Sequence, residues 1–283
     1  LQYKAVGGAH TLPAMARQFA HLAYRMIDED MPVDVSRDYA LSHIDSEDLL
    51  HMAHDANILD YNGETLRFYH QLIQEFFAAL WLQNESVEQI IPEPVFSNRG
   101  IRVASKWDEV FVALVGLQRQ PDKLIRQIMA IDPWLAERCI ESGIEVSAEV
   151  REALLESLVA FLDAEDISLR LATVTSLESV GQPASAQLLY ALRNDLHDVR
   201  NKAADALRRL DVRPIQAYVA EDYAFYLLAT SQLELCIEQG ANAIQPMKLM
   251  LTDQHFWQYR YSNLEEIVLW SLYQLGTPEA LDV

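Results

Sequence analysis

The residue with the clearest chemical potential is His70, which lies in the stretch LRFYHQLIQEFFAALWL, residues 66–82. This stretch begins like a β-strand and continues as an amphipathic helix, so the histidine falls at the junction. Imidazole changes charge near neutral pH, and its ring N–H groups donate hydrogen bonds. Two interpretations compete: a packed or capping histidine, or a polar group directed at something that the rest of the chain does not contain.

Two further polar residues, Gln74 and Glu75, lie on the helix that follows His70. Their side chains could take part in proton transfer, but the simpler interpretation is structural. We expect a hydrogen bond or an ion pair that locks this helix against a neighbouring element.

His43, His51 and His54 raise the possibility of a zinc site, because residues three positions apart share one face of a helix. A zinc site also needs a positioned third ligand, and none is evident. We therefore expect a solvated helix face and no metal. Cys139 and Cys236 have neither metal-ligand spacing nor a neighbouring base, so both are predicted to be core residues.

The net charge of −20 narrows the classes of partner. An acidic chain repels phosphate backbones and anionic membrane surfaces, so nucleic acid and membrane are poor candidates. The two widely separated cysteines fit a reducing compartment. With no long apolar run and no signal peptide, a cytoplasmic location is expected. The chain begins without Met and stops where another helix should start, so we expect a piece of a longer protein, and whether residues 1–10 fold with it stays open.

The elements around His70 predict a small domain of residues 1–84. A helix is expected over residues 12–30, and a second one opens after Ile44 with Asp45 or Ser46 as its cap. Asn62-Gly63 separates two strand-like runs, and this pair favours a hairpin because both residues tolerate positive φ. The predicted helix 70–82 closes the domain. Its expected buried residues are Leu72, Ile73, Phe76, Phe77 and Leu80. Helices followed by one hairpin are typical of a winged helix.

Residues 85–147 are expected to form a helical linker. A loop in IIPEPVFSNRGIRV precedes helices in KWDEVFVALVGL and DKLIRQIMAIDPWLAERCIESG. Pro121 and Pro133 fall near helix starts, where a missing N–H costs least.

Residues 148–283 repeat with an offset of 30 residues, which aligns Leu162 with Leu192 and Arg170 with Arg200. Pairs of short helices on such a period form an α-solenoid, in which each repeat buries its apolar face against its neighbours. The two arginines are expected to tie adjacent repeats, each through a preceding aspartate, namely Asp166 and Asp195. The fold class is thus mainly α: a winged-helix domain with a small β-hairpin, followed by a HEAT-like solenoid.

At this point the chain resembles a known family. The stretch FYHQLIQEFFAA, residues 68–79, resembles the signature F-x-H-x-x-x-Q-E-[FY]-[FL]-A-A that closes the winged-helix domain of NACHT proteins, a group of STAND signalling NTPases. The unit NDLHDVRNKAADALRRL resembles a short bacterial HEAT repeat, and the segment between them resembles the family's linker. The resemblance covers nearly the whole chain.

The resemblance implies that His70 contacts the β-phosphate of ADP in an NTPase core and helps to hold a resting state. That core, with its ADP or ATP and Mg, would precede Leu1, because G-x-x-x-x-G-K-[ST] is absent from this chain. The chain itself is therefore expected to be no enzyme and to hold no cofactor.

An aromatic-rich segment, QHFWQYRYSNLEEIVLWSLY, presents a second candidate site. Phe256, Trp257, Tyr259 and Tyr261 lie too close together for all of them to face one helical core. Packing in an irregular repeat is the first expectation, and an exposed anchor patch for a protein partner is the alternative.

The sequence leads to three functional hypotheses. The first is the regulatory and sensor region of a NACHT-type NTPase, whose repeats engage a protein trigger, release the core, and permit homo-oligomerisation, with antiviral defence as one setting. The second is a constitutive HEAT-repeat scaffold without a switching role. The third, a HEAT-type lyase or hydroxylase, has no metal or nucleophile constellation to support it.

Overall fold

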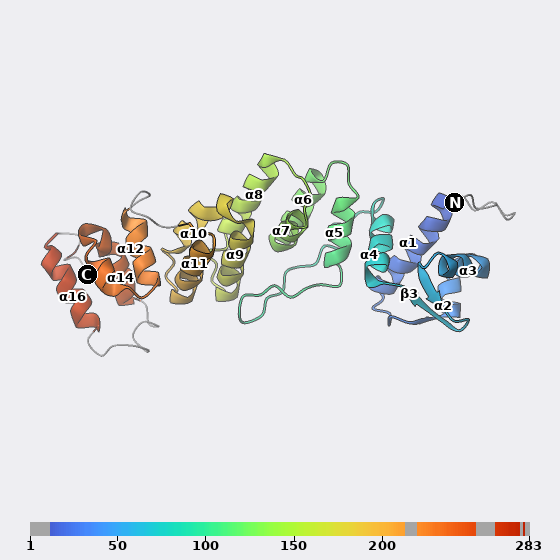
Figure 1. Ribbon diagram of the computed structural model, residues 1–283, viewed down its shortest axis with the longest axis horizontal. Coiled ribbons are helices and arrows are strands. Elements are labelled where there is room, and N and C mark those ends of the chain that lie inside the picture. The colour runs from blue at the N-terminus through green and yellow to red at the C-terminus, as the bar shows by residue number, and fades with distance from the viewer. Residues whose placement is uncertain (1–11, 213–219, 253–263, 278–279, 281–283) are drawn as a thin grey trace. The chain divides into compact units, whose positions relative to one another are not determined.

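The computed structural model describes residues 12–212, 220–252, 264–277 and 280. It is mainly helical, with one small three-stranded antiparallel sheet (Figure 1). The chain divides into two compact units. The first unit comprises Leu1–Glu93 and Ala104–Ser147, and the second comprises Pro94–Val103 and Ala148–Val283. Each unit is described separately below.

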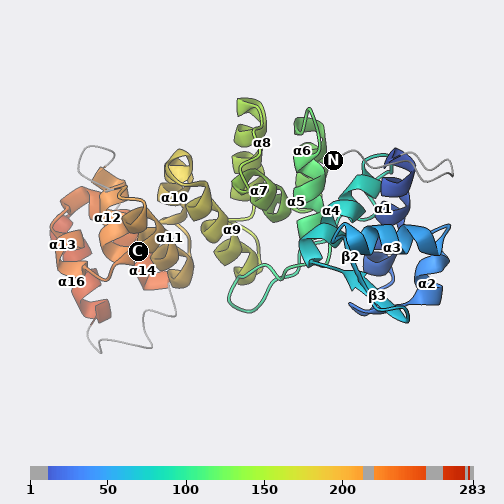
Figure 2. The same cartoon turned by 45° about the vertical axis from the view of Figure 1, so that its right-hand side comes forward.

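The first unit is centred on two packed helices, α1 (Leu12–Asp28) and α4 (Gln71–Leu82). The rings of Phe19 on α1 and Phe77 on α4 meet edge to face, with their centroids 6.0 Å apart. Between them in sequence lie α2 (Arg37–Leu41) and α3 (Glu47–Asp55), seen beside the sheet in Figure 2. Ser46 caps α3 by accepting a hydrogen bond from the N–H of Leu49, as one of the two predicted caps.

The sheet has the order β1-β3-β2, with β1 at Val35–Ser36, β2 at Leu59–Tyr61 and β3 at Thr65–Phe68. The pairing of β2 with β3 confirms the predicted hairpin. Its turn differs from the prediction in one respect, because only Gly63 has a positive φ, of 96°. Asn62 instead uses its side chain, whose Oδ1 accepts the N–H groups of Glu64 and Thr65 at 3.0 and 2.9 Å.

The predicted buried face of α4 is partly wrong. Leu72 and Phe76 are 72% and 43% exposed, and Ile73, Phe77 and Leu80 are only half-buried. The buried residues of this helix are Glu75, Ala78, Ala79 and Leu82. They follow the i, i+3, i+4, i+7 spacing of one helical stripe, and the small alanines let α1 and α5 approach closely. The sequence of α4 contains two apolar stripes, and the stripe with the smaller side chains is the one that packs against α1 and α5.

Three further helices complete the first unit: α5 (Asp108–Gly116), α6 (Asp122–Met129) and α7 (Pro133–Glu141). Pro121 immediately precedes α6, and Pro133 is the first residue of α7, so both prolines occupy the predicted helix starts. Asp132 caps α7 by accepting the N–H of Leu135 at 3.0 Å. The core of this part includes Phe111 and Ile125.

The second unit contains successive helices that pack on their neighbours in sequence. The helices are α8 (Ala148–Val159), α9 (Ile167–Val180), η1 (Gln182–Ala184), α10 (Ser185–Ala191), α11 (His197–Arg209), α12 (Ala220–Ala229), α13 (Leu233–Ile237), η2 (Gly240–Ala243), α14 (Ile244–Thr252) and α16 (Leu264–Leu275). The aligned residues Leu162 and Leu192 are both fully buried, as are Leu177 and Leu207. The 30-residue offset therefore corresponds to equivalent core positions.

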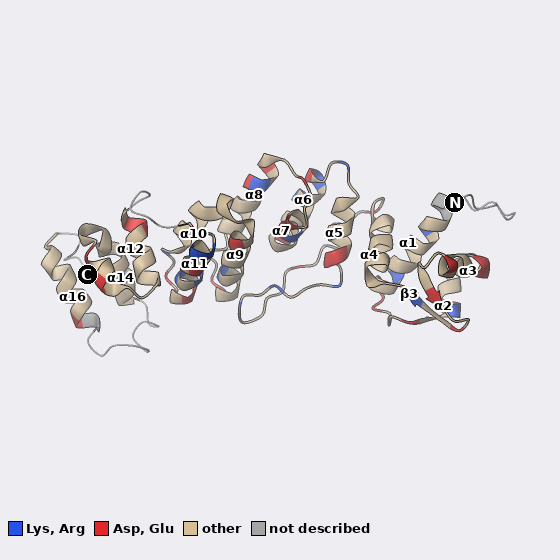
Figure 3. Ribbon diagram, in the orientation of Figure 1, with Lys and Arg blue, Asp and Glu red and all other residues tan. Residues whose placement is uncertain are grey.

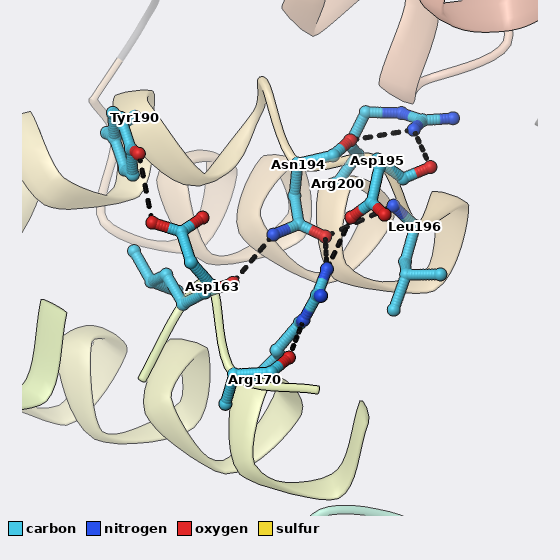
Figure 4. A network of polar contacts seen from close by, with 9 residues as sticks. Asp163, Arg170, Tyr190, Asn194, Asp195, Leu196 and Arg200 are labelled. Atoms are coloured by element: carbon cyan, nitrogen blue, oxygen red, sulfur yellow. Dashed lines mark hydrogen bonds and ion pairs between the residues drawn. The ribbon is translucent and has the colours of Figure 1, made fainter. Parts of the chain in front are cut away.

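The two aligned arginines stabilise this packing, and each donates a hydrogen bond to the carbonyl of the residue six positions earlier in the sequence (Figure 4). Arg170 donates to the carbonyl of Ala164, and Arg200 donates to the aligned carbonyl of Asn194 at 2.8 Å. Arg170 also reaches forward to the side chains of Asn194, at 3.1 Å, and Asp195. The link between repeats therefore exists, but its predicted partner Asp166 is wrong. Asp166 instead caps α9, accepting the N–H of Ser168 at 2.7 Å.

The segment Pro94–Val103 folds back as a small hairpin, closed by an isolated bridge between Phe96 and Arg102. Its turn residue Gly100 has a φ of 65° and lies against α9. A Cβ at this position would lie 2.5 Å from the Cβ of Leu171 and 2.8 Å from the carbonyl oxygen of Ser168. Only glycine satisfies both the backbone conformation and the close contact.

Candidate functional site

His70 is exposed at the start of α4. Its backbone is extended, and its carbonyl accepts the N–H groups of Ile73 and Gln74 at 2.9 and 3.3 Å. Its side chain makes no capping hydrogen bond, and its ring lies edge-on to that of Tyr69 with centroids 5.1 Å apart. The packed and capping interpretations are therefore both wrong. The imidazole can meet an acceptor outside this chain.

Exposed apolar residues precede and follow this histidine in the sequence. Tyr69, Leu72 and Phe76 are 52%, 72% and 43% exposed. Leu72 and Phe76 are four residues apart and share one side of α4, with Tyr69 just before the helix. We call these three residues the α4 apolar face. No basic residue occurs on α4, as Figure 3 shows, so His70 is the one side chain of the junction that can bring positive charge to it.

Glu75 lies in the buried stripe of the same helix, and it is only 5% exposed. Its Oε1 accepts a hydrogen bond from Gln71 at 2.8 Å, while Oε2 has no hydrogen-bond partner in the described residues. Burial raises the pKa of this carboxyl, and the nearby Glu109 on α5 adds repulsion. The predicted lock to a neighbouring element is therefore wrong for Glu75, because its hydrogen bond stays within α4.

A polar cluster ties α3 to the sheet. Arg37 donates two hydrogen bonds to Glu47, at 2.8 and 2.6 Å, and the hydroxyl of Tyr61 donates to the same carboxylate at 2.9 Å. The bond from Arg37, followed by that from Tyr61, lowers the pKa of Glu47 to about 2. Every member of this cluster has a partner, so its role is to hold the sheet in place.

The histidines considered as zinc ligands lie in different surroundings. The Nδ1 of His54 accepts the N–H of Tyr61 at 3.2 Å, and the His51 ring packs on the Tyr61 ring. His43 instead contacts His21, with ring centroids 5.0 Å apart. In residues 12–212, 220–252, 264–277 and 280, no three His, Cys, Asp or Glu side chains gather as a metal site would require.

His21 is a candidate binding residue that the sequence did not single out. It lies on α1, stacks on Trp81 at 4.4 Å and lines a polar pocket of about 390 Å³ with Arg25 and Glu85. Burial, followed by repulsion from His43, lowers its pKa. The recurrence of Arg17, His21 and Arg25 every four residues along one helix face was the available signal.

The remaining predictions concern the two cysteines and the aromatic segment. Cys139 and Cys236 are both buried, as predicted, and burial raises the pKa of the Cys236 thiol to about 12. Such a thiol is a poor nucleophile. Phe256, Trp257, Tyr259 and Tyr261 fall outside the described residues. In the described part of the chain, no helix has the length and apolar character to cross a membrane.

Comparison with known proteins leaves the family open. No family model matches the chain, and no curated protein is recognisably similar to it. The inference of function therefore starts from His70, its surroundings and the motif in which it lies.

Proposed function

We propose that residues 1–84, which lie in the first unit, form a winged-helix domain that restrains the nucleotide-bound core of a NACHT-type STAND NTPase. The second unit would form HEAT-like repeats that sense a protein trigger, with antiviral defence as one setting. The observation that carries this proposal is the exposed position of His70 in the motif of residues 68–79. An external anion would explain an exposed histidine whose side chain makes no capping bond and which lies in a stretch that resembles a phosphate-contact motif.

The local electrostatics support a phosphate contact. His70 precedes the first turn of a 12-residue helix, where unsatisfied N–H groups favour an anion. An imidazole N–H beside them adds a donor, which becomes stronger when the ring is protonated. No acidic residue occurs in the first turn of α4 to oppose the anion.

The α4 apolar face supports docking of a protein domain at the same place. Tyr69, Leu72 and Phe76 are exposed apolar side chains, which a partner surface can remove from water. An NTPase core that covered this face would bring its bound ADP to His70. A trigger on the repeats would then loosen the contact, and nucleotide exchange and homo-oligomerisation would follow.

Nucleotide is expected to bind only to the longer protein that this proposal requires. The chain contains no G-x-x-x-x-G-K-[ST], so it lacks the loop that cradles phosphates. His70 would supply one contact to ADP held by the core, with Mg completing the site there, and the present residues would perform no catalytic step.

The test is ADP affinity of the longer protein with His70→Ala. Losing a hydrogen bond from a charged donor costs about 1.5–3 kcal/mol, so affinity should fall about tenfold or more. Spontaneous activation, measured as oligomer formation without a trigger, should rise. His51→Ala is the matched control, because His51 is exposed in the same unit but lies away from the junction. Unchanged ADP binding in His70→Ala would instead mean that the stretch of residues 68–79 is a signature of the fold only.

A further inference from the structure

The second unit contains a groove that the proposed NTPase role does not use. It has a volume of about 540 Å³ and is lined by residues of α13 and α16. The lining residues are Glu234, Ile237, Glu266, Ile267, Trp270 and Ser271. The groove is open to solvent, so a side chain from outside can enter it.

Apolar side chains form most of the groove surface. Trp270 is 64% exposed, and Ile267, one turn earlier on the same side of α16, is 43% exposed. The opposite side of this helix is buried, because Val268 and Leu272 belong to a core cluster with Met247 of α14. Helix α16 is therefore apolar on two sides, and only one of them is covered in the described residues.

The rim of the groove carries negative charge. Glu234 and Glu266 line it from α13 and α16, and neither makes an ion pair in the part of the chain that the structure describes. The ribbon of α16 is red only near its first residues, and no blue occurs along it (Figure 3). An occupant with basic groups beside an apolar surface would pack on the apolar lining of the groove and pair with the acidic residues at its rim.

We propose that this groove binds a basic amphipathic helix of a protein partner. Apolar side chains on one face of such a helix would pack on Trp270 and Ile267, and flanking Lys or Arg residues would pair with Glu234 and Glu266. An exposed tryptophan in a groove is the kind of residue that dominates binding energy. A second copy of this chain is a poorer occupant, because it would bring the same glutamates and a charge of −20.

The probe is a synthetic peptide of roughly 18 residues, helical over about five turns, with leucines on one face and lysines beside them. Its twin has every lysine replaced by glutamate. Binding to the 283-residue chain is measured by titration calorimetry at about 0.15 M salt. The basic peptide should bind with a micromolar Kd, and the acidic twin at least about tenfold more weakly.

Two substitutions locate the binding. Trp270→Ala should weaken the basic peptide about tenfold or more, whereas Trp270→Phe, which keeps an aromatic ring, should lose much less. The double change Glu234→Gln and Glu266→Gln should weaken binding and flatten its salt dependence. Circular dichroism melting verifies that each variant remains folded.

The matched controls are Tyr273→Ala, an exposed aromatic of α16 outside the groove, and Glu156→Gln, an exposed acid on α8. Both should leave the Kd within about twofold. Equal binding of the two peptides, or no effect of Trp270→Ala, would overturn the proposal. Concentration-dependent dimerisation that Trp270→Ala abolishes would assign the groove to a second copy instead. The outcome does not depend on whether His70 contacts ADP.

Discussion

Helix α4 of the first unit and helix α11 of the second bury a charged side chain in different surroundings. Helix α11 buries Arg200 completely, and its guanidinium donates to the carbonyls of Asn194 and Asp195 at 2.8 and 2.9 Å. Helix α4 buries Glu75 with one carboxylate oxygen unsatisfied, while Leu72 and Phe76 face solvent. The guanidinium on α11 is thus held by backbone carbonyls of its own unit. Helix α4 exposes an apolar side.

The difference shows how residues that maintain the fold can be distinguished from residues that bind a partner. A polar group that repeats at a fixed offset and is satisfied by backbone carbonyls serves the repeat packing. An exposed histidine beside exposed apolar side chains has no such local explanation. The contrast supports a structural role for Arg170 and Arg200 and a binding role for the junction at His70.

The largest effect is expected for Arg200→Ala. This change removes the donor to a buried carbonyl, that of Asn194, and to the half-buried carbonyl of Asp195, and it leaves a cavity, so we expect a loss of about 3 kcal/mol or more of unfolding free energy. Urea unfolding followed by circular dichroism measures it. Arg208→Ala on the same helix is the control. Arg208 is exposed, and among the described residues it pairs with Asp205, so its loss should cost under about 0.5 kcal/mol. Equal effects of the two changes would contradict the assigned role of Arg200.

The next effect separates the two sides of α4. Leu82 is fully buried, so Leu82→Ala should cost about 2–5 kcal/mol of unfolding free energy. Leu72→Ala should change it by less than about 0.5 kcal/mol, because the side chain is exposed. Thermal and urea unfolding of both variants test this. A large loss from Leu72→Ala would mean that the predicted buried stripe was right after all.

The smallest effect is a gain in stability from Glu75→Gln. Since the folded pKa of Glu75 is raised above its unfolded value, the native state binds more protons between the two values. Wild-type stability therefore falls as pH rises from the ordinary carboxyl range through the folded pKa. The glutamine variant escapes this loss and should be more stable by about 1 kcal/mol at pH 7.

Unfolding of wild type and Glu75→Gln across a pH series checks the sign. The advantage of the variant should shrink as pH falls through the folded pKa and below about 4, where the wild-type carboxyl becomes protonated in both states. Glu156→Gln, at an exposed position, should show no such trend. A variant less stable than wild type at pH 7 would mean that the charge of Glu75 stabilises the fold.

Local chemistry explains what was predictable about this fold. Ser46 at a helix start, Gly63 in the hairpin and Pro133 at a first helical position act through their own backbone preferences, so the sequence displays them directly. The 30-residue offset was also visible, because equivalent core positions need similar side chains. The partners of Arg170 were not, since they depend on how neighbouring helices stack.

The two candidate sites also differ in how much of each the sequence could reveal. The motif around His70 identified the residue, but its exposure depends on which stripe of α4 meets α1 and α5. The groove beside Trp270 brings together residues more than thirty positions apart, from Glu234 to Ser271, so no local pattern contains it.

By itself, the sequence determined the mainly helical class, the hairpin, the repeat offset and the junction at His70, because these follow from backbone preference and apolar periodicity. Tertiary structure decided that Glu75 and the alanines face inward while Leu72 and Phe76 face outward. It also decided that Arg170 bonds forward to Asp195. The physical reason is that close packing chooses among stripes of similar hydrophobicity by shape, and shape exists only after the helices meet.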